Sequence, residues 1–278
     1  MTWDRRTEDL GNIVAFGHLN VRVPDQPKAL QFHVQGLGLT RDPEMQTGTG
    51  NAWINVGTSQ FHLPTGPAQV LRGVTGLVMP DLDALIARLA AIAPAMHGTA
   101  FEFTRRHDGA GDRVDVRSPW GNRLRVHAPD AQRFGRMTLG MPYLEIDTGR
   151  GSAAGIARFY AQVLGTQAAC ESDAGATVAR IVVGPHECLR FRETDRTLPA
   201  YDGHHLQITV ADFSGVHRRL LERGLISEES DQSQYRFQDI VDPDTGAVLS
   251  TLEHEVRSLR HPQHARALLN APAFDPRR

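Results

Sequence analysis

Hydrophobic and polar positions first form a regular pattern at residues 18–25, where apolar and polar side chains alternate. This alternation is typical of a β-strand buried on one face. Asp25 then begins a helical segment, which we expect to end at Gly36 and Gly38 because glycine readily adopts the left-handed conformation at a helix end. Short strands are predicted to follow at residues 40–43, 51–56 and 59–63. The pattern therefore predicts one strand, one helix and three strands in succession.

The same order of elements returns three more times. Residues 75–81 predict a strand that ends in Pro-Asp, a signal for a helix start, and residues 82–93 carry leucine and isoleucine at helical spacing. Three strands complete this second module, at residues 101–105, 113–117 and 122–127. The third module is expected to have a strand at residues 143–148, a helix at residues 153–164 and three strands that end near residue 192. The fourth is expected to have a strand at residues 205–210, a helix at residues 213–224 and three strands that end near residue 255.

Short segments also recur at a nearly constant distance along the chain. FHVQGLGL at residues 32–39 returns as FYAQVLGT at residues 159–166, an offset of 127. Two more pairs keep the same order and nearly the same spacing: VGTSQFHL with VGPHECLRF, and SPWGNRLRV with DPDTGAVLS. The repeat predicts two homologous domains at 12–130 and 137–256, joined by a short linker near 131–136. Residues 1–11 are then an N-terminal tail, and residues 257–278 a C-terminal tail or helix.

Composition narrows the function classes. The 278 residues are 40 % hydrophobic, enough for two ordinary cores, and the net charge is −2 with no long basic run. Nucleic-acid binding is not expected, because it needs clustered lysine and arginine. No apolar stretch approaches the roughly 20 residues of a membrane span, and the N-terminus is polar, so we expect neither membrane contact nor a signal peptide. Two cysteines fit a reducing, cytoplasmic location.

The four modules, the FH or FY…LG helix exits and the Ser-Pro or Asp-Pro turns before the last strands together resemble the vicinal oxygen chelate superfamily. This superfamily includes glyoxalase I, bleomycin resistance proteins and extradiol dioxygenases. The resemblance implies an α+β fold of four βαβββ modules that form two tandem open barrels. It also implies a divalent metal held by ligands on the first, fourth, fifth and eighth strands of a barrel. In length, the chain is most similar to type I extradiol dioxygenases, which hold iron or manganese with two His and one Glu.

In the second domain, the resemblance places ligand positions at Tyr143, His205 and Ser250. Only His205 is a metal-ligand type, so a standard dioxygenase site is not expected. A shift of three residues would offer Glu253 as the carboxylate, but side chains alternate along a strand, so this shift requires a bulge.

In the first domain, His18 and His62 occupy two ligand positions and Val74 and Arg125 the other two. Two imidazoles can bind zinc, nickel or iron weakly, with a third ligand from His127 or a partner chain. Arg125 argues against a metal, because a guanidinium cannot ligate and repels cations, but it suits a carboxylate or phosphate. The candidates for substrate contacts are Arg125, Tyr143, Tyr201 and Arg190.

Two functions remain open. The first is a small-molecule enzyme, an oxygenase, lyase or isomerase, that uses iron, manganese, zinc or nickel and no organic cofactor. The second is a metal-free protein that binds or sequesters a small molecule. The resemblance favours the enzyme, whereas neither domain contains a complete ligand set. A monomer or a homodimer is expected in either case.

Overall fold

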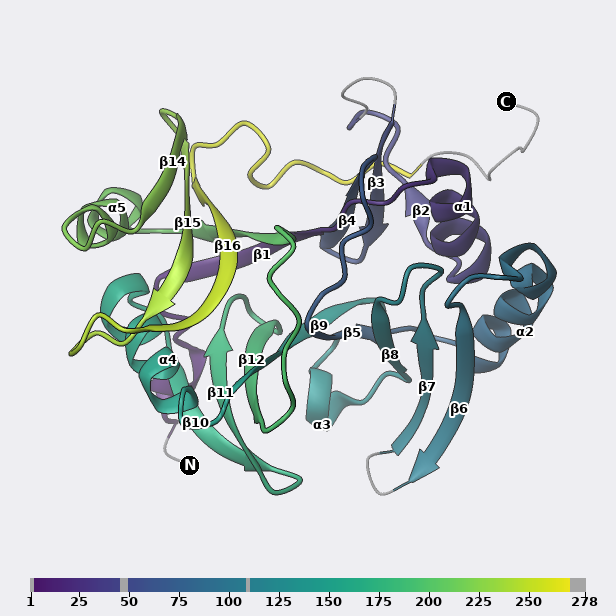
Figure 1. Cartoon of the computed structure of the whole chain (residues 1–278), viewed down its shortest axis with the longest axis horizontal. Helices are drawn as coiled ribbons and strands as arrows, with labels where there is room; N and C mark the ends of the chain where they lie inside the picture. Colours follow the sequence, from purple (N-terminus) through teal and green to yellow (C-terminus); the bar gives the residue numbers. More distant parts are fainter. Residues whose placement is uncertain (1–2, 46–49, 109–110, 271–278) are drawn as a thin grey trace. The chain divides into compact units, whose positions relative to one another are not determined.

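The computed structural model describes residues 3–45, 50–108 and 111–270 (Figure 1). A single 3-10 turn, η1 (Arg5–Glu8), precedes the first module. The first module consists of β1 (Ile13–Asn20), α1 (Gln26–Leu30), the π-helical η2 (Gln31–Gly36), β2 (Thr40–Arg41), β3 (Asn51–Val56) and β4 (Ser59–Pro64). The second consists of β5 (Gly73–Val78), α2 (Leu82–Ile92), η3 (Ala93–Met96), β6 (Glu102–Asp108), β7 (Gly111–Arg117) and β8 (Arg123–His127).

The second half of the chain repeats this order after a one-turn helix, α3 (Ala131–Phe134), in the predicted linker. The third module consists of β9 (Gly140–Gly149), α4 (Ala153–Phe159), η4 (Tyr160–Leu164), β10 (Ala168–Asp173), β11 (Ala176–Val182) and β12 (Cys188–Thr194). The fourth consists of β13 (His205–Val210), α5 (Phe213–Leu221), β14 (Ile226–Asp231), β15 (Gln234–Val241) and β16 (Val248–Ser258). The predicted series of four strand–helix–three-strand modules is therefore confirmed.

The strands form two eight-stranded mixed sheets. Their orders are β14-β15-β16-β13-β1-β4-β3-β2 and β10-β11-β12-β9-β5-β8-β7-β6. In the first two modules, the first and fourth strands pair in parallel, β1 with β4 and β5 with β8, while the remaining strands pair antiparallel. The predicted ligand sets combined modules that are consecutive in sequence. Each sheet instead contains one module from each half of the chain: the first with the fourth, and the second with the third.

Contacts divide the chain into two compact units. The first unit contains Met1–Phe16, Asp147–Leu198 and Gln207–His264, and the second contains Gly17–Ile146, Pro199–Leu206 and Ala265–Arg278. Each unit has a buried core of large side chains. Phe159, Tyr160, Phe191, Tyr235 and Phe237 lie in the first unit, and Phe32, Ile54, Leu63, Leu77, Leu85 and Leu89 lie in the second.

Helix starts follow the sequence signals closely. The side chains of Asp25, Asp81 and Asp212 each accept a hydrogen bond from a backbone N–H in the first turn of the helix that follows. The prediction for the end of the first helix was partly wrong. Gly38 has a φ of +77°, but Gly36 is not left-handed; a Cβ there would lie 2.5 Å from Cδ1 of Ile92, so Gly36 permits close packing of η2 on α2.

The first strand and the C-terminal segment also differ from expectation. β1 begins at Ile13, so His18 lies inside the strand rather than at its start. Residues 259–270 contain turns but no helix, and residues 271–278 lie outside the described part of the chain. Within the described ranges, no helix is long and apolar enough to cross a membrane.

Candidate metal site

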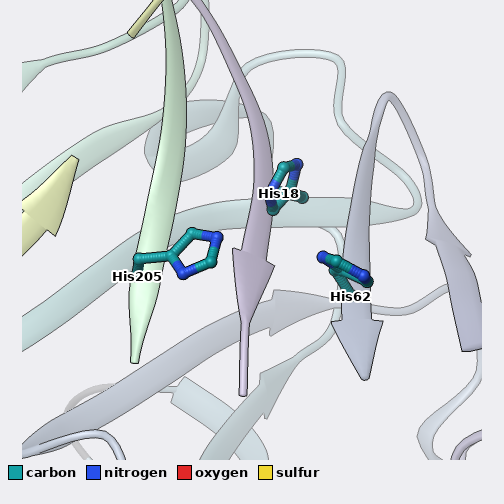
Figure 2. Close-up of side chains that lie close together, drawn as sticks. All are labelled: His18, His62 and His205. Atoms are coloured by element: carbon teal, nitrogen blue, oxygen red, sulfur yellow. The ribbon is translucent and has the colours of Figure 1, made fainter. Parts of the chain in front are cut away.

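Three histidines from three neighbouring strands converge in the second unit. His18 lies on β1, His62 on β4 and His205 at the first residue of β13, and these strands are adjacent in the order β13-β1-β4. One ring nitrogen of each residue lies within 4.8 Å of the corresponding nitrogens of the other two. The three rings point toward a common point from separate strands (Figure 2).

The three imidazoles are enclosed by the protein. His18 and His205 are 2 % and 9 % exposed, His62 is half-buried, and the Nε2 atom of each ring is shielded from solvent. The rings meet edge to face: the centroid of His18 is 5.5 Å from that of His62 and 5.8 Å from that of His205. Three imidazoles in contact are a typical arrangement for a transition-metal site.

His62 is held in place by two residues of the same module. Trp53 lies directly opposite it in the β3–β4 ladder, and the two rings stack with centroids 3.8 Å apart and planes 12° from parallel. In addition, the side-chain amide nitrogen of Asn20 is 2.6 Å from Nδ1 of His62. Both contacts restrict the orientation of the ring, which is what a ligating imidazole requires.

His205 is positioned by the turn that precedes β13. Asp202 accepts hydrogen bonds from the Val70 N–H at 2.6 Å and from the His204 Nδ1–H at 2.6 Å, and the backbone of Gly203 is left-handed, with a φ of +87°. Burial opposes ionisation of Asp202, but these hydrogen bonds outweigh it and lower the pKa of the carboxyl group. The turn is therefore fixed to residues 69–70, and β13 begins at a defined point.

Comparison with known proteins agrees with this arrangement of modules. Residues 15–126 match the family model described as the Glyoxalase/Bleomycin resistance protein/Dioxygenase superfamily. The chain therefore carries a domain of this superfamily. The match begins within β1 and ends within β8, and it includes His18 and His62.

Solved structures resemble nearly the whole chain in fold. Glyoxalase I from Zea mays is 13 % identical, with 92 % of this chain and 95 % of that chain covered and a TM-score of 0.61. A putative dioxygenase from Bacillus subtilis is 14 % identical, with 93 % and 92 % covered and a TM-score of 0.59. At these identities, the likeness establishes the fold alone. No curated protein matches the sequence.

The strand order brings together histidines that were predicted to belong to two separate sites. His205 was expected in the ligand set of Tyr143 and Ser250, but it lies with His18 and His62 because β13 is next to β1. His127, considered as a third ligand for the first set, instead places Nε2 2.8 Å from the hydroxyl of Tyr143. The third imidazole near His18 and His62 is thus that of His205.

Glu253 lies outside this cluster. Its carboxylate accepts a hydrogen bond from Nη1 of Arg236 at 2.5 Å, and the group of potential ligands found in the described residues contains the three histidines without it. A carboxylate already paired with a guanidinium makes a poorer metal ligand, because the cation competes for the same oxygen.

The predicted substrate-binding residues lie in different surroundings. Nε of Arg125 is 3.5 Å from Asp115, and Arg190 forms 2.6 Å hydrogen bonds with Glu171 and Asp173. The hydroxyl of Tyr201 donates to the carbonyl of His204, while the guanidinium of Arg72 lies 5.5 Å from its ring centroid. Tyr201 therefore stabilises the turn before His205.

Sequence reasoning missed Asn20 and Trp53. Asn20 is two residues after His18 on β1, so strand alternation alone placed both side chains on one face. Trp53 could not be found in this way, because its position opposite His62 depends on the register of β3 and β4.

Proposed function

We propose that this protein is a metal-dependent enzyme that acts on a small oxygenated molecule, with His18, His62 and His205 as the metal ligands. The observation that carries the proposal is the convergence of three imidazoles, two from the first module and one from the fourth, with ligand atoms within 4.8 Å.

The donor set fits a transition metal. Two nitrogens bound to one tetrahedral zinc ion at 2.0–2.1 Å lie about 3.4 Å apart. The three nitrogens are near enough that small rotations of the side chains bring them to this spacing. Imidazole suits zinc, iron and nickel, whereas oxygen-rich sites suit manganese. We therefore expect zinc, iron or nickel.

The metal, when bound, supplies a Lewis acid that polarises substrate oxygens and a template that orients them. Three protein ligands leave coordination positions for the substrate. Neutral imidazoles bring no negative charge, so they favour a substrate that binds through an anionic oxygen. The best substrate class is therefore an anion with two adjacent oxygen atoms.

Asn20 and Trp53 prepare His62 for this role. The side-chain nitrogen of Asn20 lies 2.6 Å from Nδ1 of His62, and this contact fixes the ring in the plane of the hydrogen bond. Trp53 covers one face of the ring and limits its rotation. The metal ligands would then be oriented before an ion enters, which lowers the entropy cost of binding.

Elemental analysis of the purified full chain tests the proposal. We expect close to one equivalent of a transition metal, retention in the control His97→Ala at an exposed histidine, and loss in His18→Ala, His62→Ala and His205→Ala. Circular dichroism checks that each variant is folded. Metal content that is equal in all four variants, or zero in wild-type protein after incubation with zinc, ferrous iron and nickel, would refute the proposal.

Activity assays then separate the reaction classes. Oxygen uptake with catechol and ferrous iron would assign an oxygenase, and metal-dependent conversion of an anionic substrate without oxygen uptake would assign an isomerase or lyase. Metal-free protein that binds such a molecule as tightly as the metal-loaded protein does would instead support a binding or sequestering function.

A further inference from the structure

The second sheet contains a polar cluster in the places that correspond to the histidines. In strand order, β9, β5 and β8 hold the positions that β13, β1 and β4 hold in the first sheet. Arg125 lies on β8 and Tyr143 lies on β9. Gly76 of β5, the strand between them, is directly opposite each of these residues. Arg125, Tyr143 and Gly76 all belong to the second unit.

Gly76 allows Tyr143 to reach across β5. A Cβ at Gly76 would lie 2.4 Å from ring atoms of Tyr143, so the ring covers the space that a side chain would fill. Its hydroxyl is thereby brought to β8, where it lies 2.8 Å from Nε2 of His127. The hydroxyl of Tyr143 therefore lies next to β8, the strand that also carries Arg125.

His127 is a buried and neutral partner. It is 2 % exposed, and burial together with Arg133, Arg125 and Arg113 lowers its pKa to about 3. As a neutral ring, it orients the tyrosine hydroxyl without adding charge. Its Nδ1 atom has no hydrogen-bond partner among the described residues.

Arginines outnumber carboxylates on this face. Asp115 lies between Arg113 and Arg125, with its Oδ1 3.5 Å from Nε of each, and Nε of Arg106 is 3.6 Å from its Oδ2. These distances exceed the 2.7–2.9 Å of a charge-assisted hydrogen bond. Arg113 also forms a 2.6 Å ion pair with Asp108, so two carboxylates face three guanidiniums, and the looser contact is that of Arg125. One positive charge is therefore in excess beside the tyrosine hydroxyl.

Arg125 is more accessible than Arg113. Arg125 and Asp115 are 35 % and 38 % exposed, and Arg113 is 13 % exposed. A guanidinium cannot hold a metal, but its planar fork of donors matches a carboxylate or a phosphate. This face is therefore suited to anions.

We propose that Arg125, Arg113 and Tyr143 form a second binding site, separate from the three histidines, for the carboxylate or phosphate group of a small organic anion. The guanidiniums neutralise the anion. Nε2–H of His127 donates to the hydroxyl oxygen of Tyr143, so that the hydroxyl hydrogen is donated to the anion. The proposal is independent of the metal site, since none of these residues belongs to the histidine cluster.

Titration calorimetry of the full chain in chelator tests this site, with inorganic phosphate and malonate as probes and chloride at matched ionic strength as reference. We expect saturable binding of one anion, weakened at least about tenfold by Arg125→Gln and about two- to tenfold by Tyr143→Phe. The stronger of the two probes identifies the preferred anionic group.

Arg117→Gln is the matched control. Arg117 lies on β7, forms a 3.1 Å ion pair with Glu102, and its substitution removes the same charge as Arg125→Gln. Equal weakening by both substitutions would show diffuse attraction and overturn the proposal, as would the absence of saturable binding. His205→Ala should keep anion binding, and its loss there would place the anion at the histidines instead.

Discussion

Lowering the pH should destabilise the protein through histidines that are buried in the neutral form, and His254 provides the clearest case. It is fully buried and stacks on Phe237 with planes 11° from parallel. Its Nδ1–H donates to the carbonyl of Leu252 at 2.7 Å, and the hydroxyl of Tyr160 donates to its Nε2 at 2.6 Å. A proton on Nε2 would compete with the tyrosine hydrogen, in a place that water does not reach.

The magnitude follows from the pKa shift. Burial lowers the pKa of His254 to about 3, from 6.5 in an exposed residue. Below pH 6.5, the unfolded chain therefore binds a proton that the folded chain does not, and stability falls as the pH falls. At pH 5.5, this histidine contributes a slope of about 1.2 kcal/mol per pH unit. Between pH 6.5 and 4.5, it accounts for about 2 kcal/mol, and His33, whose pKa burial lowers to about 4, accounts for a similar amount.

Urea unfolding at intervals between pH 6.5 and 4.5 measures this slope. His254→Gln should reduce it by about 1.2 kcal/mol per pH unit at pH 5.5, whatever its effect on stability at pH 7. Tyr160→Phe is the control, since it removes a hydrogen bond and costs about 1–3 kcal/mol but keeps the titrating ring. If the free energy of unfolding falls by the same amount per pH unit in His254→Gln and in wild-type protein, the ring is already protonated in the folded state and the reasoning is wrong.

Three further outcomes follow from single contacts in the second unit. Asn20→Ala should weaken metal binding by about 10- to 100-fold without abolishing it, because it removes the group that orients His62; competition with a chelator measures the change. Gly73→Ala should prevent stable folding, since its Cβ would lie 1.8 Å from a carbonyl oxygen of β9; thermal unfolding and expression yield would show this, and a midpoint within about 2 °C of wild type would contradict it. Arg266→Gln should destabilise the chain by about 3 kcal/mol, because it leaves the fully buried Asp42 carboxylate without its cationic partner; chemical unfolding would measure the loss.

Much of the fold was determined by local sequence. Alternation and helical spacing predicted the four modules, and the aspartates before the helices marked their starts, because capping is a contact between residues three positions apart or fewer. The end of the first helix was predicted less well, since Gly36 is needed for contact with Ile92, 56 positions away in the sequence. The division into domains at 12–130 and 137–256 stays a prediction from the repeat.

The candidate site was predicted residue by residue but not as a group. His18, His62 and His205 were identified as candidate ligands because each matches a ligand position of the superfamily that the sequence resembles. Their convergence depends on which strands are neighbours. Strand order is set by packing between modules far apart in the chain, which places β13 beside β1. The tertiary structure alone therefore decided that the three histidines form one cluster, and that Arg125 and Tyr143 lie together in the other sheet.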